Sequence, residues 1–238
     1  FTNASQTLRE ERASRAAATC RNPHGGHLVT TASGVPEVVV ERLPQYLRAL
    51  AHLEASGIDV INSQQLGELL QVTPAQIRKD LSYFGRFGKQ GRGYSISYLQ
   101  ASLRNILGLD QTWDVAVVGT GRLGRSIISY PGFEPEGFRV VCAFDIDRSI
   151  VGQEAGGLVV DDFTNFQEVT ERKGVQIAIV AVPAAVAQEV IDRLVDAGIK
   201  AVLNYAPKSA LTPADVRVRN VDPVVALQSM TYYLNIDR

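Results

Sequence analysis

The sequence predicts an α/β protein in which an N-terminal winged helix-turn-helix domain is followed by a doubly wound parallel sheet. From Trp113 onward, apolar strand-like runs alternate with helical runs, which is typical of a parallel sheet covered by helices on both faces. Earlier in the chain, two short helical segments flank a tight turn and precede a glycine-rich hairpin. The 238 residues suffice for two domains, each with its own core.

The composition is that of an ordinary globular protein. Hydrophobic residues make up 45% and charged residues 21%, and the net charge is −1, so any basic surface must be local. No apolar run approaches the ~20 residues of a membrane helix. Cys20 and Cys142 are too few for a disulfide framework and fit a reducing cytoplasm, and Cys142, in an apolar strand, should be a core residue. We interpret the isolated pair His24 and His27 as surface residues and predict no metal site.

Changes of pattern along the chain predict four segments. Residues 1–34, rich in Ser, Thr, Ala and Arg, should form a flexible tail, and they lack the apolar segment of a secretory signal. The winged-helix domain is expected over 35–111, the parallel-sheet domain over 112–221 and a C-terminal helix over 222–238.

The winged-helix domain should open with a helix between Pro36 and Gly57. Apolar residues recur three and four positions apart in this stretch, and we expect Pro44 to separate a short lead-in from a longer helix. Gly57 should end it.

Two short helices and a hairpin should complete this domain. We expect Ser63 to cap a helix that runs through Leu70, and Thr73 with Pro74 to open the next one after the turn "QVT". The glycines after Gly85 then predict a hairpin, the wing, and a helix should follow over about 98–107.

Basic residues gather in this part of the chain. Between Pro74 and Arg104 there are six of them against one acid, Asp80, which favours binding to DNA phosphates. The alternative is a solvated basic face on a helical interaction domain. With Ile77 and Leu81 facing the core, the expected DNA contacts are Gln76, Arg78, Lys79, Ser82, Tyr83, Arg86, Lys89 and Arg92.

The second domain should alternate strands and helices. We expect strands at 114–119, 139–145, 157–160, 175–182, 199–205 and 216–221, with helices at about 122–129, 163–173 and 184–197.

A glycine motif follows the first of these strands. Gly119, Gly121 and Gly124 have the spacing G-x-G-x-x-G, which permits a tight turn, close approach of a pyrophosphate, and close packing of helix on strand. Asp145 stands 21 residues further on, where a carboxylate can accept hydrogen bonds from the adenine ribose. Together they predict a Rossmann dinucleotide site. A carboxylate there repels a 2′-phosphate and favours NAD(H) over NADP(H), although Arg148 acts in the opposite sense; alternatively, Asp145 only caps the next turn.

Two later turns should face the same edge of the sheet, because ligands of open α/β sheets bind at the carboxyl ends of strands. They are "AVPAA" and "NYAP", and each has an ordinary loop as its alternative. The expected cofactor-binding residues are Gly119, Thr120, Gly121, Arg122, Leu123, Gly124, Asp145, Asp147, Val182, Pro183, Asn204, Tyr205, Ala206 and Pro207.

The chemistry of a dehydrogenase is missing from this domain. All three histidines precede it, and Tyr205 and Lys208 have Y-x-x-K spacing instead of the helical Y-x-x-x-K of a catalytic pair. We therefore predict no catalytic residues and a protein that is not an enzyme. The alternatives are an NAD-dependent oxidoreductase with an accessory helical domain and a regulator that senses another nucleotide.

The chain closes with "PVVALQSMTYYLN", a helix from Pro223 that is apolar around most of its circumference. Such a helix must be buried, and a subunit interface is the natural place.

Several of these motifs together resemble one family. "QLGELLQVTPAQIRKDLSYFGRFGKQGRGY", "VVGTGRLGRSIISYPGF", "AFDID", "AVPAAVAQEVIDRLVDAGIKAVLNYAP" and "NVD", in this order, resemble the bacterial Rex redox-sensing transcriptional repressors over about residues 36–238. The resemblance implies a cytoplasmic homodimer that binds an inverted-repeat DNA operator, with NAD⁺ permitting binding and NADH releasing it.

The same resemblance implies roles for particular residues. The C-terminal helix would be swapped between subunits, and Tyr205 would approach the cofactor across the dimer interface. Tyr130 would lie near the nicotinamide, and with Arg48 and Asp222 it would couple the redox site to the DNA-binding domain.

Overall fold

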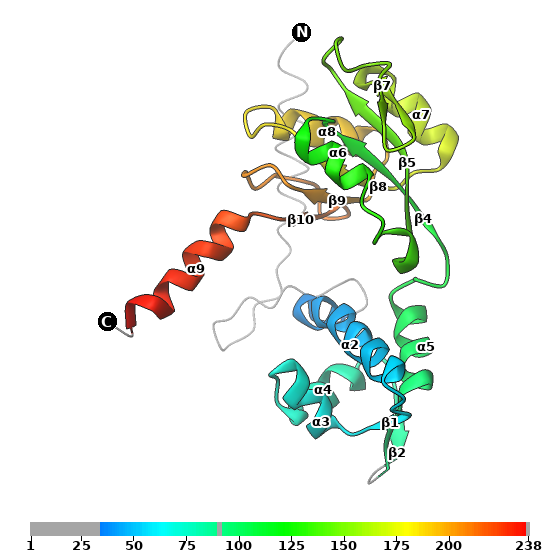
Figure 1. The fold of residues 1–238 in the computed structure, drawn as a ribbon, viewed down its shortest axis with the longest axis vertical. Helices are drawn as coiled ribbons and strands as arrows, with labels where there is room; N and C mark the ends of the chain where they lie inside the picture. The colour runs from blue at the N-terminus through cyan, green and yellow to red at the C-terminus, as the bar shows by residue number, and fades with distance from the viewer. Residues whose placement is uncertain (1–33, 90–91, 237–238) are drawn as a thin grey trace. The chain divides into compact units, whose positions relative to one another are not determined.

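The computed structural model describes residues 34–89 and 92–236, which form two compact units divided between Gln111 and Thr112 (Figure 1). The expectations for the tail, for Cys20, His24 and His27, and for the tip of the wing lie outside the described residues. Among those described, no helix is long and apolar enough to cross a membrane. Within the same ranges, no three His, Cys, Asp or Glu side chains are grouped so that they could hold a metal ion.

The first unit is a winged helix-turn-helix, as predicted. Its buried core joins the first and last helices to the two between them, and β1 pairs antiparallel with β3, which pairs antiparallel with β2. Strand β1 was not expected from the sequence. The elements are α2 (Glu37–Ala55), β1 (Val60–Ile61), α3 (Ser63–Leu70), α4 (Pro74–Ser82), β2 (Gly88–Lys89), β3 (Gly93–Ser95) and α5 (Ile96–Ile106).

Helix α2 is continuous through Pro44, so the expected break is wrong. A proline in a helix interior removes one hydrogen bond and costs about 3 kcal/mol. Leu43, Leu47 and Leu50 are buried before and after it, and their packing against the core holds the helix together across the proline. Gly57, with φ of +77°, follows the end of the helix as expected.

The cap of α3 is Asn62, and the expectation that Ser63 caps this helix is wrong. The Asn62 side chain accepts hydrogen bonds from the amides of Gln64 and Gln65 at 2.9 Å, and its own amide donates to the Gln65 side chain at 3.0 Å. Asn and Ser are comparable caps, so residue type alone does not choose between neighbouring positions. Thr73 caps α4 and Pro74 begins it, both as predicted.

The turn between α3 and α4 depends on two residues. Gln71 adopts the left-handed conformation with φ of 56°. A Cβ on Gly67 would lie 2.5 Å from the carbonyl oxygen of Val72, so a larger residue at position 67 would push the two helices apart. The close crossing of α3 and α4 therefore requires this glycine.

The second unit is a seven-stranded sheet in the order β10-β9-β8-β4-β5-β7-β6, parallel except for β6. The first strand of this unit, β4, lies in the middle of the sheet, and later strands are added on either side of it, which is the doubly wound arrangement predicted for this domain. Its strands are β4 (Trp113–Val118), β5 (Phe138–Asp145), β6 (Glu154–Ala155), β7 (Leu158–Asp162), β8 (Ile177–Val180), β9 (Ala201–Asn204) and β10 (Arg217–Asn220). Its helices are α6 (Arg122–Ile128), η1 (Glu134–Glu136), η2 (Phe163–Asn165), α7 (Phe166–Lys173), α8 (Ala187–Asp196) and α9 (Pro223–Ile236).

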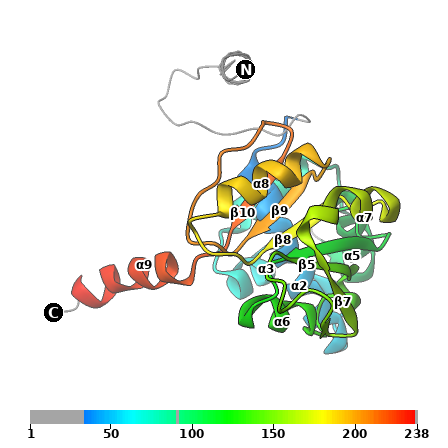
Figure 2. The ribbon, with the colours of Figure 1, turned by 90° about the horizontal axis from the view of Figure 1, so that it is seen from above.

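Alternate residues of the strands pack on opposite faces of this sheet. Ala116 and Val118 face a cluster that includes α7 and α8, whereas Val115 and Val117 face a cluster that includes α6. Figure 2 shows α8 and α6 on opposite sides of the strands. Cys142 belongs to the first cluster, where burial raises the pKa of its thiol to about 12, which agrees with an inert core residue.

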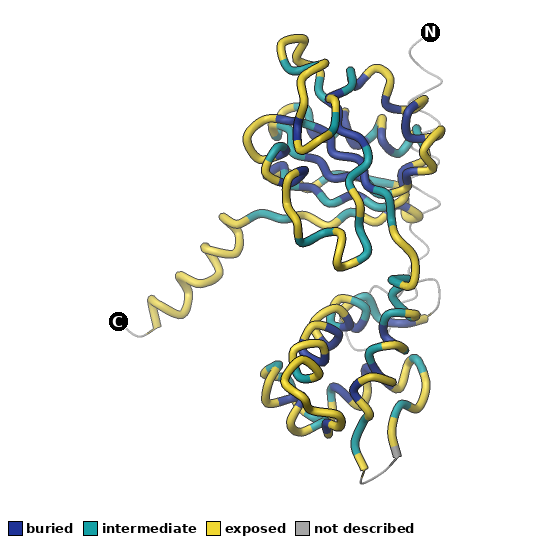
Figure 3. Tube along the Cα trace, turned by 45° about the vertical axis from the view of Figure 1, so that its right-hand side comes forward, coloured by how far each residue is buried: buried dark blue, intermediate teal, exposed yellow. Residues whose placement is uncertain are grey.

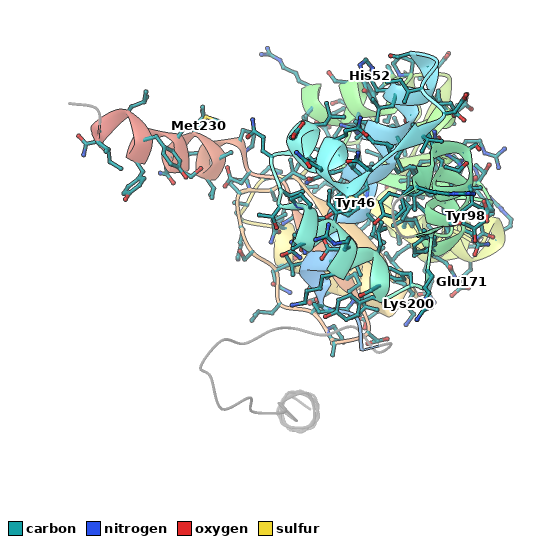
Figure 4. All side chains as sticks on the ribbon, turned by 90° about the horizontal axis from the view of Figure 1, so that it is seen from below. Tyr46, His52, Tyr98, Glu171, Lys200 and Met230 are labelled. Atoms are coloured by element: carbon teal, nitrogen blue, oxygen red, sulfur yellow. The ribbon has the colours of Figure 1, made fainter. Side chains whose placement is uncertain are left out.

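Helix α9, unlike the other α-helices of this unit, has no buried residue. Every residue of Pro223–Ile236 is exposed in the single chain (Figure 3), although the helix contains no charged side chain. Met230, labelled in Figure 4, is 57% exposed. The helix predicted from Pro223 is thus confirmed, and among the described residues the chain's own core does not bury it.

Candidate functional site

A cavity of about 490 Å³ opens at the carboxyl ends of β4, β5 and β8. This is the point at which the strand order reverses, where open α/β sheets bind their ligands. Of the residues expected to bind the cofactor, those that line it are Gly119, Gly121, Arg122, Leu123, Asp145, Asp147, Val182 and Pro183.

The three glycines of the turn after β4 differ in what surrounds them. Gly119 has φ of +89°, and a Cβ there would lie 2.5 Å from the carbonyl oxygen of Ala181 on the neighbouring strand. A Cβ on Gly124 would collide with the carbonyl oxygen of Gly119. Gly121, by contrast, has nothing within 4 Å of its Cβ position and stands at the N-cap of α6. The first and third glycines are therefore needed by the protein itself, and the second leaves an open space.

Asp145 holds this turn in place. One carboxylate oxygen accepts from the amide and the hydroxyl of Thr120 at 2.7 and 2.9 Å, and the other accepts from the amides of Ile146 and Asp147 at 2.8 and 3.0 Å. Burial by itself would raise the pKa of Asp145, but these hydrogen bonds outweigh it and hold the pKa below its ordinary value. Asp145 is thus an ionised carboxylate in the cavity wall whose oxygens also fix two backbone turns.

Asp147 is the more exposed acid of the pair. One of its oxygens accepts from the amide and the hydroxyl of Ser149, which lowers its pKa. Both acids line the cavity, so its rim on this side carries negative charge.

The far wall of the cavity was not predicted. Arg193 lies 4.3 Å from the centroid of the Phe163 ring and donates to the Phe163 carbonyl at 3.4 Å. Val186, the N-cap of α8, and Glu189, Val190 and Arg193 within α8 have the spacing i, i+3, i+4, i+7, which puts them on one helical face and could have identified this wall from the sequence. The additional lining residues are Val118, Ile146, Ile150, Phe163, Ala181, Val186, Glu189, Val190 and Arg193.

Some predicted residues lie behind the cavity. Thr120 is fully buried against Asp145, and Gly124 packs under Gly119. Asn204 is also fully buried: its amide nitrogen donates to the Lys208 carbonyl and the Asn220 side chain, both at 2.8 Å. Its side-chain oxygen accepts a hydrogen bond from the backbone amide of Ala206 at 3.0 Å, so Asn204 fixes the turn in which it lies.

The rest of the "NYAP" turn is not part of the cavity wall in the single chain. Tyr205 packs with the cluster on the α6 face, Ala206 is buried and Pro207 is exposed.

The three residues with an expected coupling role are accessible. Tyr130 is 59% exposed and makes an edge contact with Phe133, their ring centroids 5.2 Å apart. Asp222 accepts a hydrogen bond from the amide of Val224 at 2.9 Å and so caps α9. Arg48 is exposed on α2 in the first unit.

The first unit carries a basic surface on α4 and beyond. Ile77 and Leu81 are buried as expected, while Arg78, Lys79, Ser82, Tyr83, Arg86 and Arg92 are exposed. Arg78 donates to the Ser63 hydroxyl at 2.8 Å, which holds its side chain across α3 and α4. Lys89 lies in β2, and its side chain is outside the described residues.

Asp80 and Gln76 differ from the rest of this surface. Asp80, the acid counted against the basic residues, is completely buried and paired with Arg42 on α2. Gln76 is half-buried and donates to Asp80 at 2.6 Å. The acid is therefore compensated inside the unit and does not oppose an anion on its surface.

Comparison with known proteins finds two family models, one mainly in each unit. Residues 34–82 match the family described as putative DNA-binding protein N-terminus, and residues 110–208 match the family described as CoA binding domain. The redox-sensing transcriptional repressor Rex of Chloroflexus aggregans is 53% identical over 199 residues, which are 84% of this chain and 94% of that protein. The Rex of Roseiflexus sp. is 48% identical over 202 residues, or 85% and 92% of the two chains.

Two solved structures of one protein, RSP, resemble most of this chain. RSP in complex with β-NAD⁺ and operator DNA has a TM-score of 0.81 and 38% identity, covering 85% of this chain and 94% of that chain. RSP in complex with β-NADH has a TM-score of 0.78 and 36% identity, covering 85% and 95%. Since both the identities and the coverage extend across the two units and not over one alone, the chain belongs to the family of redox-sensing transcriptional repressors named Rex, whose members are regulators and not oxidoreductases.

Proposed function

We propose that this protein is a DNA-binding transcriptional repressor of the cytoplasm that senses the ratio of NADH to NAD⁺. The observation that carries the proposal is the presence, in one chain, of a dinucleotide-type cavity and a basic helix-turn-helix surface. A relative of the same fold has been crystallised with NAD⁺ and operator DNA together, and also with NADH. Both ligands are thus known for a protein with this arrangement of domains.

The cavity fits a dinucleotide. Nothing within 4 Å occupies the Cβ position of Gly121, and the backbone amides at the start of α6 are available to phosphate oxygens there. The carboxylates of Asp145 and Asp147 suit ribose hydroxyls and repel a 2′-phosphate, so we infer that NAD(H) binds in preference to NADP(H). The part of the wall formed by Val186, Val190 and Phe163 would then take the adenine.

The nicotinamide half would extend toward the remaining predicted residues. We infer that Val182 and Pro183 contact it within the subunit, that Tyr130 lies near the ring, and that the turn of Asn204 to Pro207 approaches it. Because Tyr205 lies outside the cavity wall of the single chain, we assign its cofactor contact to the partner subunit of a homodimer.

A dimer also supplies the missing cover for α9. Burial of each large apolar side chain contributes a stabilising free energy of roughly 1.5–3 kcal/mol. These side chains of α9 are exposed in the single chain, so this stabilisation requires a partner. We infer that α9 is swapped onto the partner subunit, and that two recognition helices are thereby held at the spacing of an inverted-repeat operator.

Sensing requires that the two cofactor states prefer different dimer arrangements. NAD⁺ and NADH differ at the nicotinamide in charge and planarity, and a ligand with equal affinity for two states shifts neither. A tenfold preference corresponds to about 1.4 kcal/mol per site. We propose that NADH favours a closed dimer whose recognition helices no longer fit successive major grooves, with Arg48, Tyr130 and Asp222 linking the cofactor to this change.

The test is a titration of labelled operator duplex with the protein at saturating NAD⁺ and at saturating NADH. We expect tight binding of the operator with NAD⁺ and at least tenfold weaker binding with NADH. Equal affinity in both states would overturn it. An NAD-dependent oxidoreductase, the second candidate, would instead show sustained NADH turnover with small oxo substrates.

A further inference from the structure

A buried carboxylate lies on α4, the helix that we expect to contact DNA. Asp80 has a side-chain exposure of 0%, yet it belongs to α4 between the exposed residues Lys79 and Ser82. It accepts hydrogen bonds from Arg42 Nε at 2.6 Å and Nη2 at 2.8 Å, and from the Tyr46 hydroxyl at 2.6 Å. The fourth donor is the Gln76 amide at 2.6 Å.

These four side chains join α2 to α4, and we call them the α2–α4 clamp. Arg42 and Tyr46 stand one turn apart on α2, on either side of Pro44, and both reach the same carboxylate. Figure 4 labels Tyr46, which is almost completely buried. A paired fork of guanidinium and carboxylate fixes direction as well as distance. The clamp therefore sets the rotation of α4 about its own axis relative to α2.

The clamp also decides how Gln76 presents its amide. An ionised carboxylate can only accept hydrogen bonds, so the NH₂ group of Gln76 must point to Asp80. One N–H is used there, which leaves the second N–H and the carbonyl oxygen of the same amide. A donor and an acceptor side by side match N7 and the N6 amino group at the major-groove edge of adenine.

We propose that Asp80 is a positioning residue for operator recognition, and that it holds Gln76 so that Gln76 reads an adenine in the major groove. The inference rests on the proposed function, because it requires that α4 is the helix that enters the groove. Gln76, held by the buried Asp80, would thus read the DNA sequence from a surface whose basic residues are expected to bind phosphates.

The loss of a base contact has a different effect on DNA affinity from the loss of a phosphate contact. Loss of a phosphate contact weakens binding to every duplex and lowers the dependence of affinity on salt, whereas loss of a base contact weakens only the specific site. The comparison of operator with random DNA, each at several salt concentrations, separates the two roles.

The experiment uses the full-length protein and the operator that the wild-type protein selects from a pool of random duplexes. Gln76→Leu removes the reading amide, and Tyr46→Phe removes one partner of Asp80 while keeping the ring. Gln167→Leu is the matched control, because Gln167 donates to Glu171 at 2.9 Å in the same i, i+4 geometry on α7, in the other unit.

Gln76→Leu is expected to bind the selected operator about tenfold more weakly, with random-DNA affinity, salt dependence and NADH affinity unchanged. The loss should disappear when one particular A·T pair in each half-site is replaced. Tyr46→Phe should relax the preference for that same base pair, and Gln167→Leu should match the wild type.

The inference is overturned if Gln76→Leu binds the operator like the wild type, or if operator and random DNA lose affinity equally. It is also overturned if Tyr46→Phe leaves the base preference intact. If the wild-type protein selects no operator, the proposed function fails and this inference fails with it. If the protein selects an operator that NADH does not release, only the redox sensing of the proposed function fails. The two failures are thus distinguished by the wild-type arm.

Discussion

At the residue scale, the glycine turn separates what the protein needs from what its ligand needs. Gly119→Ala would place a methyl group 2.5 Å from the Ala181 carbonyl at a φ of +89°, whereas Gly121→Ala meets nothing within 4 Å. We expect Gly119→Ala to lower both thermal stability and NADH affinity. Gly121→Ala should keep the melting temperature and lose at least tenfold in NADH affinity, because its methyl group occupies the phosphate's space.

Calorimetry of NADH binding and thermal melts of both variants would check this pair. Normal NADH affinity in Gly121→Ala would show that phosphates bind elsewhere.

Asp80 gives a prediction for the dependence of stability on pH. Burial would raise its pKa, but hydrogen bonds from Arg42, Tyr46 and Gln76 lower it below the ordinary value. A carboxylate with a lowered folded pKa stabilises the fold at pH values above its unfolded pKa of about 3.9, and this contribution is lost as the pH falls through the folded pKa. Its two titratable partners do not change state there: Arg42 stays charged and Tyr46 stays neutral, because the pKa of each is raised still further above this range.

The difference in unfolding free energy between wild type and Asp80→Asn should therefore be constant from pH 8 to about pH 5 and shrink below about pH 4. Urea unfolding followed by circular dichroism measures it. A difference that grows as the pH falls would contradict the assignment.

Residue identities were easier to predict than residue contacts. The glycine spacing and the acid at the end of β5 identified one wall of the cavity, because each has a fixed place in the motif. The sequence does not show which partners a side chain's hydrogen bonds have. Asn204 donates to the Lys208 carbonyl within its own turn. Asp80 is buried beside Arg42, which is 38 positions away in the sequence.

At the scale of elements, α2 shows how packing overrides local preference. Pro44 leaves the carbonyl of Val40 without its usual helical donor, and the buried residues on both sides keep the helix intact. Pro44→Ala restores that hydrogen bond and should stabilise the protein by about 1–2 kcal/mol, since part of the roughly 3 kcal/mol gain is offset by a more flexible unfolded chain.

Pro74→Ala is the control, because a proline in the first turn of α4 interrupts no hydrogen bond, and it should not stabilise the protein. Thermal unfolding compares the two. A Pro44→Ala variant less stable than the wild type would mean that the proline has a structural role in α2.

The elements that the sequence missed are the shortest ones. β1 and β6 each have two residues and are strands only because β3 and β7 lie beside them. Two residues carry no periodicity, so only tertiary pairing defines such strands. The long parallel strands, with their apolar runs and regular spacing, were predicted to within a few residues.

At the scale of the whole molecule, α9 is the exposed apolar helix that the proposed dimer would cover. Leu227 and Leu234 lie two turns apart on this helix and are 61% and 69% exposed. Changing both to Asp should dissociate the dimer and abolish operator binding, because an apolar interface does not tolerate unpaired carboxylates. Leu211→Asp, at a loop position 83% exposed, is the matched control and should remain dimeric.

Sedimentation equilibrium gives the molecular weights of these variants. A double variant that stays dimeric would place the subunit interface elsewhere.

The proposed regulation depends on one linkage, between the redox state of the bound dinucleotide and the affinity of the dimer for DNA. It is measured most directly by the fluorescence anisotropy of a labelled operator at fixed total NAD(H) while the NADH fraction is varied. We predict an operator dissociation constant that rises at least tenfold as NADH replaces NAD⁺, with no such rise for NADPH. A dissociation constant that stays the same at every ratio would contradict redox sensing by this protein.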